Sequence, residues 1–477
     1  MLEFFSKKNT LGSFIDNQFV INRSKTPITL RSCVTNEPWL KIHQASELQI
    51  ASAIQKSHQA YVSFRNTSSY YRAKILRTLM DLIRQSQSDL ARIITTEMGK
   101  TYKEAFSEIE YGLGYFDWFA DAAMKTYGYE IPSNKPEKTL LVTHEAIGPS
   151  AIITPWNFPF AMAARKIAPA IAAGCTVVVK PSPETPMTLL ALAELFKRAK
   201  LPPSVLQVLI GNENLIGKML SSAKEIRKIS FTGSTKVGIQ LYEKSAKTLK
   251  KATLELGGNA PLLVFNDANI SLAVEETIKA KFRNHGQSCV AVNRILLQKK
   301  IAPKFIEKFV QKIKELKVGN PFREDMQLTN VLHIQSRKKI KKHIEDALRK
   351  GAKLILKGKS EVYPHVLINC TKDMLVFNEE TFGPLASIFT FDTDEHGITL
   401  ANTTPYGLAA YLFTKDIARI QETAKRLEYG MIGVNDGVFS THQIPFGGIK
   451  ASGFGREGGP FGIYEYLVEK TISIKHH

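Results

Sequence analysis

The sequence predicts an α/β fold in which two parallel-sheet domains share the chain. Its 477 residues exceed what one hydrophobic core usually serves, so two or three domains are expected. Apolar residues recur at helical spacing across residues 46–125. From about residue 147 to residue 430, short β-rich runs alternate with amphipathic stretches, which is typical of βαβ units.

The helical segment precedes the first alternating block. Its spacing is clearest in Ile75, Leu76, Leu79, Met80, Leu82 and Ile83. The first block has predicted strands at 151–154, 176–179, 205–209 and 228–231, with predicted helices near 186–199 and 212–223. Parallel βαβ units bind ligands at the carboxyl ends of their strands, and such a sheet suits a dinucleotide.

A second alternating block runs from Ala260 to about residue 430. Its predicted helices lie at 270–281 and 302–315, and its predicted strands lie near 262–265, 294–298 and 408–413. No internal repeat or low-complexity linker separates the two blocks. We therefore expect the functional site in the cleft between the two domains.

Composition narrows the class of protein. The chain is 44% hydrophobic and 23% charged, as soluble globular proteins are, and no stretch reaches the roughly 20 apolar residues of a membrane span. The net charge of +20 suggests nucleic-acid binding as an alternative function. Such binding needs basic residues gathered on one face, whereas here they are spread along the chain. Four scattered cysteines favour neither disulfides nor a metal site, and the first residues lack the order of a secretory signal. We expect a cytoplasmic enzyme with no metal, membrane or nucleic-acid partner.

A candidate nucleophile and a candidate base lie close in the sequence. Cys289 ends the run Phe-Arg-Asn-His-Gly-Gln-Ser-Cys, and Glu255 opens a Glu-Leu-Gly-Gly segment upstream. A thiol attacks carbon as a thiolate, and a carboxylate followed by two glycines suggests a turn that holds a base beside it. By itself, this pairing supports only a general nucleophilic cysteine.

Two segments compete as phosphate-binding turns. Residues 453–458 match G-x-G-x-x-G, but too little chain follows them to complete a βαβ unit. In residues 229–238 a β-rich run passes through Gly233 into a helical segment, whose free N–H groups favour a pyrophosphate; a simple strand-to-helix turn explains it equally well. Asn157, in a stiff loop between two prolines, could donate to an oxyanion or form an Asx-turn.

Seven segments in order resemble the NAD(P)-dependent aldehyde dehydrogenase superfamily. They are residues 154–160, 180–186, 231–238, 255–258, 286–289, 380–384 and 445–455. The series covers nearly the whole chain, and the separation of Glu255 from Cys289 is also the family's. The resemblance implies an aldehyde dehydrogenase fold with a Rossmann-like parallel-sheet cofactor domain, an α/β catalytic domain and a small β oligomerisation extension.

The resemblance also implies roles for individual residues. Cys289 would attack an aldehyde, the Asn157 amide would hold the oxyanion, hydride would pass to the nicotinamide, and Glu255 would activate the water that hydrolyses the thioester. Lys180 resembles the lysine that binds the adenosine ribose, and Glu380 the glutamate that holds the nicotinamide ribose. The other cofactor positions implied are Thr154, Pro155, Trp156, Ser182, Pro183, Gly233, Ser234 and Phe382.

Three residues bear on the substrate. Arg165 and Arg283 occupy positions where many family members carry an uncharged residue, and Ser440 adds a hydroxyl. Arginine pairs bidentately with a carboxylate. This trio resembles the succinate-semialdehyde dehydrogenase subfamily and implies oxidation of succinate semialdehyde to succinate. The alternatives are an ion-pair role for each arginine, an aldehyde dehydrogenase of general or other acidic specificity such as for glutarate semialdehyde, and an inactive scaffold or nucleic-acid-binding protein.

Some positions depart from the family pattern. Ala291 stands where some members of the subfamily have a second, switch-forming cysteine, and His285 replaces the usual alanine, which favours a packing role. NAD-preferring relatives place a glutamate three residues after the lysine; here that position is Pro183 and the carboxylate follows at Glu184, which favours NADP with use of NAD left open. Residues 327–334 depart most and have no functional interpretation.

The resemblance divides the chain into three parts. The dinucleotide-binding domain is expected in residues 1–118 and 138–254, and the catalytic domain in residues 255–435. Residues 119–137 and 455–477 are expected to form the oligomerisation extension. Because this extension pairs across subunits in the family, a homodimer or homotetramer is expected.

Overall fold

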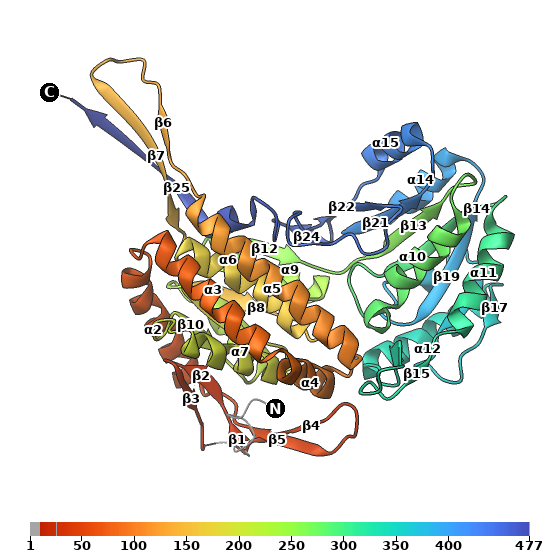
Figure 1. The fold of residues 1–477 in the computed structure, drawn as a ribbon, viewed down its shortest axis with the longest axis horizontal. Helices are drawn as coiled ribbons and strands as arrows, with labels where there is room; N and C mark the ends of the chain where they lie inside the picture. Colours follow the sequence, from red (N-terminus) through yellow and green to blue (C-terminus); the bar gives the residue numbers. More distant parts are fainter. Residues whose placement is uncertain (1–9, 25, 477) are drawn as a thin grey trace.

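Two large sheets, each covered by helices, make up the two halves of the molecule (Figure 1). The structure is a computed structural model, and it describes residues 10–24 and 26–476. Small strands open the chain, namely β1 (Thr10–Leu11), β2 (Ser13–Ile15), β3 (Gln18–Val20), β4 (Ile28–Arg31) and β5 (Pro38–Ile42). β1, β5 and β4 form a separate sheet, whereas β2 and β3 extend the first large sheet.

The helical segment expected at residues 46–125 forms four helices. They are α2 (Glu47–Phe64), α3 (Ser69–Gln85), α4 (Gln87–Met98) and α5 (Tyr102–Met124). Ser46 begins α2 with a capping box that satisfies free N–H groups, and Gly99, at φ 88°, ends α4 in the left-handed conformation that glycine tolerates. The apolar faces of α3, α4 and α5 pack with α6 and α7 in the largest core cluster, whereas Ile50, Ala53 and Ile54 of α2 belong to a separate cluster.

The first large sheet contains the predicted strands of the first block. Its order is β24-β12-β11-β8-β9-β10-β2-β3, and the pairs from β12 to β10 are parallel. The strands are β8 (Ser150–Ile153), β9 (Val177–Lys180), β10 (Leu206–Val208), β11 (Lys228–Thr232), β12 (Lys251–Glu255) and β24 (Gly453–Phe454). The connecting helices are α6 (Pro159–Ala173), α7 (Pro186–Arg198), α8 (Glu213–Ser222) and α9 (Thr235–Ala246). The G-x-G-x-x-G match begins in β24, which pairs antiparallel with β12 and opens no βαβ unit.

The second large sheet has the order β17-β18-β19-β14-β13-β21-β22. Its strands are β13 (Ala260–Val264), β14 (Val292–Gln298), β17 (Lys353–Leu356), β18 (His365–Ile368), β19 (Leu385–Phe391), β21 (Ala409–Phe413) and β22 (Met431–Val434). Its helices are α10 (Ile270–Phe282), α11 (Ala302–Lys314), α12 (Ile334–Arg349), α13 (Leu375–Asn378), α14 (Asp394–Asn402) and α15 (Ile417–Arg426). Short pairs join β15 (Val318–Gly319) to β16 (Leu328–Thr329) and β20 (Tyr406–Gly407) to β23 (Ile449–Lys450).

A narrow three-stranded sheet projects from the first half of the molecule (Figure 1). It has the order β25-β7-β6 and comprises β6 (Tyr129–Ile131), β7 (Lys138–Ala146) and β25 (Leu467–Lys475). This differs from the extension expected at 119–137, because α5 continues to Met124 and the central strand begins at Lys138. The nine residues of β7 all pair with β25, so the hairpin extends well past residue 137.

The boundary between the two large units lies near Glu255. β12 ends the first sheet at that residue, and β13 begins the second sheet at Ala260. We propose that the first domain ends at residue 254 and that the second begins at residue 255. Within residues 10–24 and 26–476, no helix combines the length and apolar character needed to cross a membrane.

Candidate active site

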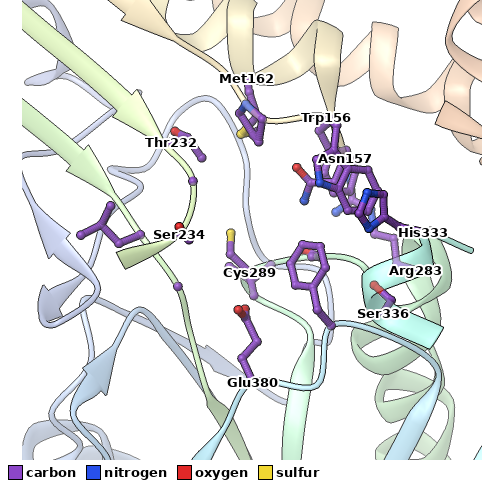
Figure 2. Close-up of a pocket in the computed structure, with 18 of the residues that line it drawn as sticks. Trp156, Asn157, Met162, Thr232, Ser234, Arg283, Cys289, His333, Ser336 and Glu380 are labelled. Atoms are coloured by element: carbon purple, nitrogen blue, oxygen red, sulfur yellow. The ribbon is translucent and has the colours of Figure 1, made fainter. Parts of the chain in front are cut away.

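A central cavity of about 310 Å³ lies where loops of the two large sheets meet. Its walls come from the loops after β8, β11 and β12 and from segments that precede β14 and β19. Figure 2 shows the Cys289 thiol within this space, with Trp156 and Asn157 on one side and Glu380 on another. The site therefore draws its side chains from both halves of the chain.

A side chamber of about 290 Å³ adjoins the central cavity. Both spaces are lined by Pro155, Trp156, Thr232, Gly233 and Ser234. The central cavity is also lined by seven other site residues expected from the sequence, namely Asn157, Arg165, Arg283, Cys289, Glu380, Phe382 and Ser440. The side chamber contacts Thr154, Lys180 and Ser182, whereas Glu255 and Pro183 line neither space.

Cys289 is held by a tightly turned loop. Asn284 and His285 adopt φ angles of 51° and 59°, in the left-handed region that residues other than glycine rarely adopt. A Cβ at Gly258 would lie 2.3 Å from the Cys289 carbonyl oxygen, so the second glycine of the Glu-Leu-Gly-Gly segment permits this close approach. Burial raises the pKa of the Cys289 thiol to about 12, and the carboxylates of Glu380 and Glu255 add to the rise.

The Asn157 amide is oriented by a hydrogen bond to the cysteine loop. Its Nδ2 donates to the Gln287 carbonyl oxygen at 2.9 Å. An amide nitrogen carries two donors, so one N–H remains available to a ligand in the central cavity. The main-chain oxygen of Asn157 in turn accepts from Lys100 Nζ at 2.8 Å and from Asn284 Nδ2 at 2.9 Å.

Sequence reasoning missed the buried ion pair behind Asn157. Lys100 Nζ lies 2.6 Å from Glu108 Oε2, and both side chains are fully buried. Glu108 Oε1 also accepts the N–H groups of Phe160 and Ala161, which are free donors at the start of α6. Glu108 lies on α5 and Lys100 lies in the turn between α4 and α5, and neither segment carries a motif, so no local pattern marked them.

Glu255 is buried behind the cavity wall. It is 1% exposed, and neither carboxylate oxygen has a hydrogen-bond partner. A Cβ at Gly447 would lie 2.9 Å from Oε1, which places the carboxylate against that glycine. Burial, followed by the nearby Glu457 carboxylate, raises the pKa of Glu255 well above its usual range, although Arg165 opposes the rise.

Arg165 has both an ion pair and an unused donor. Its Nε donates to Glu457 Oε2 at 2.7 Å, while its Nη1 is buried without a partner. Arg283 lines the same cavity with its guanidinium 5.9 Å from the centre of the Tyr111 ring. The Tyr111 and Ser440 hydroxyls lie 2.8 Å apart. Tyr111, on α5, therefore joins the predicted trio; it was missed because it lies far from the other residues in sequence.

The side chamber carries a net positive lining. Lys180, Lys218 and Lys244 line it against one carboxylate, Glu213, which Lys180 Nζ contacts at 2.8 Å. A Cβ at Gly233 would lie 2.4 Å from the Phe231 ring, so the turn after β11 is a glycine for lack of space.

Two hydroxyl groups and the N-terminus of a helix offer hydrogen-bonding groups to a polar ligand in the two spaces. The hydroxyls of Thr154 and Thr232 are buried without partners. Ser234 begins α9, whose N-terminus presents free N–H groups beside the Gly233 turn. These donors, with the lysines of the side chamber, fit the sugars and pyrophosphate of a nicotinamide dinucleotide. Glu380, whose pKa burial raises to about 7, lies at the other end of the site.

The segment that departs most from the family pattern contributes His333 to the central cavity. Its ring stacks on Trp156, with the centroids 4.7 Å apart and the planes at 18°, and Figure 2 shows the two side by side. His285, by contrast, is buried, with Nε2 2.6 Å from the Val362 carbonyl oxygen, as a packing role requires. The departure near residue 333 was visible in the sequence, but its contact was not.

Comparison with known proteins identifies the family. Residues 19–472 match the aldehyde dehydrogenase family. The chain is 44% identical to succinate semialdehyde dehydrogenase of Acinetobacter baylyi over 94% of this chain and 93% of that protein. It is 42% identical to glutarate-semialdehyde dehydrogenase of Pseudomonas putida over 97% of each. The crystal structure of succinate-semialdehyde dehydrogenase from Burkholderia pseudomallei superposes with a TM-score of 0.95 at 42% identity, covering 97% of both chains. The chain belongs to the aldehyde dehydrogenase family.

Proposed function

We propose that this aldehyde dehydrogenase oxidises succinate semialdehyde to succinate, with NADP preferred over NAD. One observation supports this substrate. Arg165, whose Nη1 has no hydrogen-bond partner, and Arg283 line the same cavity as Cys289. Two guanidinium groups and the Ser440 hydroxyl suit an aldehyde that bears a carboxylate at its far end. The resemblance to succinate-semialdehyde dehydrogenases supports the same substrate.

The chemistry assigned to the protein begins at the Cys289 sulfur. The thiolate forms a bond to the aldehyde carbon, and the carbonyl electrons move to an oxyanion that the free N–H of Asn157 stabilises. A nicotinamide dinucleotide held by the Lys180 side chain, the Gly233 turn and Glu380 would supply the acceptor for the hydride that leaves this carbon. The product on the enzyme is a thioester of Cys289, and water then cleaves the C–S bond to release the acid and the thiol.

Glu255 is the base assigned to the hydrolytic step. Burial raises its pKa well above the usual range of a carboxyl, and a more basic carboxylate is a better proton acceptor. Because its carboxylate does not line the cavity, the side chain must turn toward Cys289 to deprotonate water there. Neither carboxylate oxygen has a hydrogen-bond partner that this rotation would have to break.

Charge in the side chamber supports the cofactor preference. Three lysines outnumber the single carboxylate there, and the position that carries a glutamate in NAD-preferring relatives is Pro183, which lies outside the chamber. A 2′-phosphate on the adenosine ribose would meet positive charge and no added carboxylate. We therefore assign the chamber to the adenosine end of NADP.

Glutarate semialdehyde is the second candidate substrate, because a glutarate-semialdehyde dehydrogenase is 42% identical over nearly the whole chain. Purified protein should be assayed with succinate semialdehyde, glutarate semialdehyde and an uncharged aldehyde of similar length, each with NADP and with NAD. We expect the highest kcat/KM for succinate semialdehyde with NADP. Faster turnover of glutarate semialdehyde would favour the second candidate, and faster turnover of the uncharged aldehyde would contradict both.

A further inference from the structure

The stacked His333 also contacts the carboxylate that follows Pro183. Its Nε2 lies 3.7 Å from Glu184 Oε1. His333 comes from the loop before α12, on the second large sheet, whereas Glu184 comes from the loop after β9 on the first. The contact therefore joins the two halves of the protein beside the site.

The orientation of the His333 ring suits this contact. His333 is the N-cap of α12, and its Nδ1 accepts the N–H of Gln335 at 3.3 Å. Because Nδ1 acts as an acceptor, the ring proton of the neutral form lies on Nε2, the nitrogen that faces Glu184. The stacking on Trp156 restricts the ring further.

Glu184 is held on the His333 side of its loop. Its carboxylate accepts the hydroxyl hydrogen of Ser182 and contacts His333. Although partial burial opposes it, the contact with His333 followed by that with Ser182 lowers the pKa of Glu184 to about 2. Ser182 lines the side chamber, but Glu184 does not. Because its carboxylate contacts Ser182, Glu184 lies next to a residue that lines a chamber rich in lysine.

We propose that His333 sets the dinucleotide preference as a positioning residue, by keeping the Glu184 carboxylate out of the side chamber. The inference rests on the proposed use of that chamber for the adenosine ribose. With His333 in place, the chamber presents lysines to a 2′-phosphate. Without it, Glu184 is free to turn toward the ribose, where a carboxylate repels a 2′-phosphate and accepts hydrogen bonds from a ribose diol.

The test measures binding of NADP and NAD separately, by titration calorimetry on the full-length enzyme without aldehyde. The variant is His333→Asn, because asparagine is a strong N-cap and preserves the start of α12 while its shorter side chain loses the contact with Glu184. We expect Kd for NADP relative to Kd for NAD to rise about tenfold, since one like charge is added near the phosphate. His396→Asn, a histidine-to-asparagine change in α14 away from both spaces, should leave the ratio unchanged.

A second variant separates Glu184 from other effects of losing the ring. In His333→Asn with Glu184→Gln, the ratio should return to within about twofold of wild type, because no carboxylate remains to enter the chamber. An unchanged ratio in His333→Asn, equal weakening of both dinucleotides, or no recovery in the double variant would overturn the proposal. A wild-type preference for NAD would instead contradict the proposed cofactor, while the shift between variants would still decide the role of His333.

Discussion

Burial and neighbouring carboxylates hold the Cys289 thiol protonated near neutral pH. Its pKa is raised to about 12, by burial first and then by Glu380. Below that value the thiolate fraction rises about tenfold per pH unit. The rate of alkylation by iodoacetamide should therefore increase steadily between pH 7 and pH 10 without a plateau.

Replacing Glu380 with glutamine should speed alkylation of Cys289. The substitution removes a charge that raises the thiol pKa, so the thiolate fraction increases, by roughly three- to tenfold above pH 8. Glu380 itself has a pKa of about 7, so the gain should shrink below pH 6, where its carboxyl is neutral in both proteins. Peptide mapping of alkylated protein gives the rate at Cys289.

Two controls accompany the measurement of the alkylation rate. Cys289→Ala gives the background from the other cysteines, and Glu379→Gln removes the neighbouring carboxylate, which contacts His343 and lies outside both cavities. An equal gain in Glu380→Gln and Glu379→Gln would show that the effect is not specific to the cavity carboxylate.

Arg283 tests the proposed recognition of a distal carboxylate. Arg283→Met should raise KM for succinate semialdehyde by about 10- to 100-fold, since a hydrogen bond to a charged group contributes about 1.5–3 kcal/mol. KM for an uncharged aldehyde of similar length should change little. Arg283 is preferred to Arg165 for this test because Arg165 also holds Glu457. Equal losses on both aldehydes would assign Arg283 to packing instead.

At the scale of elements, α5 and α6 position the oxyanion loop through one buried ion pair. Glu108 on α5 accepts two N–H groups at the start of α6, and its partner Lys100 donates to the Asn157 carbonyl oxygen. The pair links helix packing to the geometry of the site.

Glu108→Ala should destabilise the protein strongly. It leaves the Lys100 charge buried without a partner and two helix N–H groups unsatisfied, which costs about 3–5 kcal/mol. The urea midpoint should fall, and kcat should fall with it. Lys100→Met with Glu108→Leu should recover part of the stability, because no unpaired charge remains.

Glu110→Ala is the matched control on the same helix. Glu110 is exposed and accepts from Gln87, so its loss should cost less than about 1 kcal/mol. A comparable fall in the urea midpoint for Glu110→Ala and Glu108→Ala would contradict the special role of the buried pair.

At the scale of the molecule, the projecting sheet presents an apolar face. Alternate residues of the edge strand β25, Val468, Ile472 and Ile474, are 42%, 38% and 42% exposed. An exposed edge strand with an apolar face is a site for association. We propose that it pairs between subunits, in a homodimer or homotetramer.

Ile472→Asp with Ile474→Asp should convert the oligomer to monomer. The charges would be buried without partners at the proposed interface, and light scattering coupled to gel filtration gives the mass. Thr471→Asp with Ser473→Asp places the same charges on the opposite face of β25 and should leave the mass unchanged. A wild-type monomer, or equal dissociation by both pairs, would contradict the proposal.

Much of the fold was predictable because local periodicity marks amphipathic elements. The predicted strand at 228–231 and the predicted helix at 270–281, for example, are β11 and α10. α6 escaped prediction because every one of its residues is buried, so it has no polar face to set a period. The N-terminal strands β1, β2 and β3 escaped because two or three residues carry too little pattern.

By itself, the sequence determined the α/β fold, the family and the residues proposed for the chemistry, since motifs and periodicity are properties of neighbouring residues. Only the tertiary structure decided that Lys100 supports Asn157, that Arg165 pairs with Glu457, and that His333 reaches Glu184. Each of these contacts joins segments distant in the chain. Their physical cause is the way helices and loops dock across the two sheets, which no local pattern encodes.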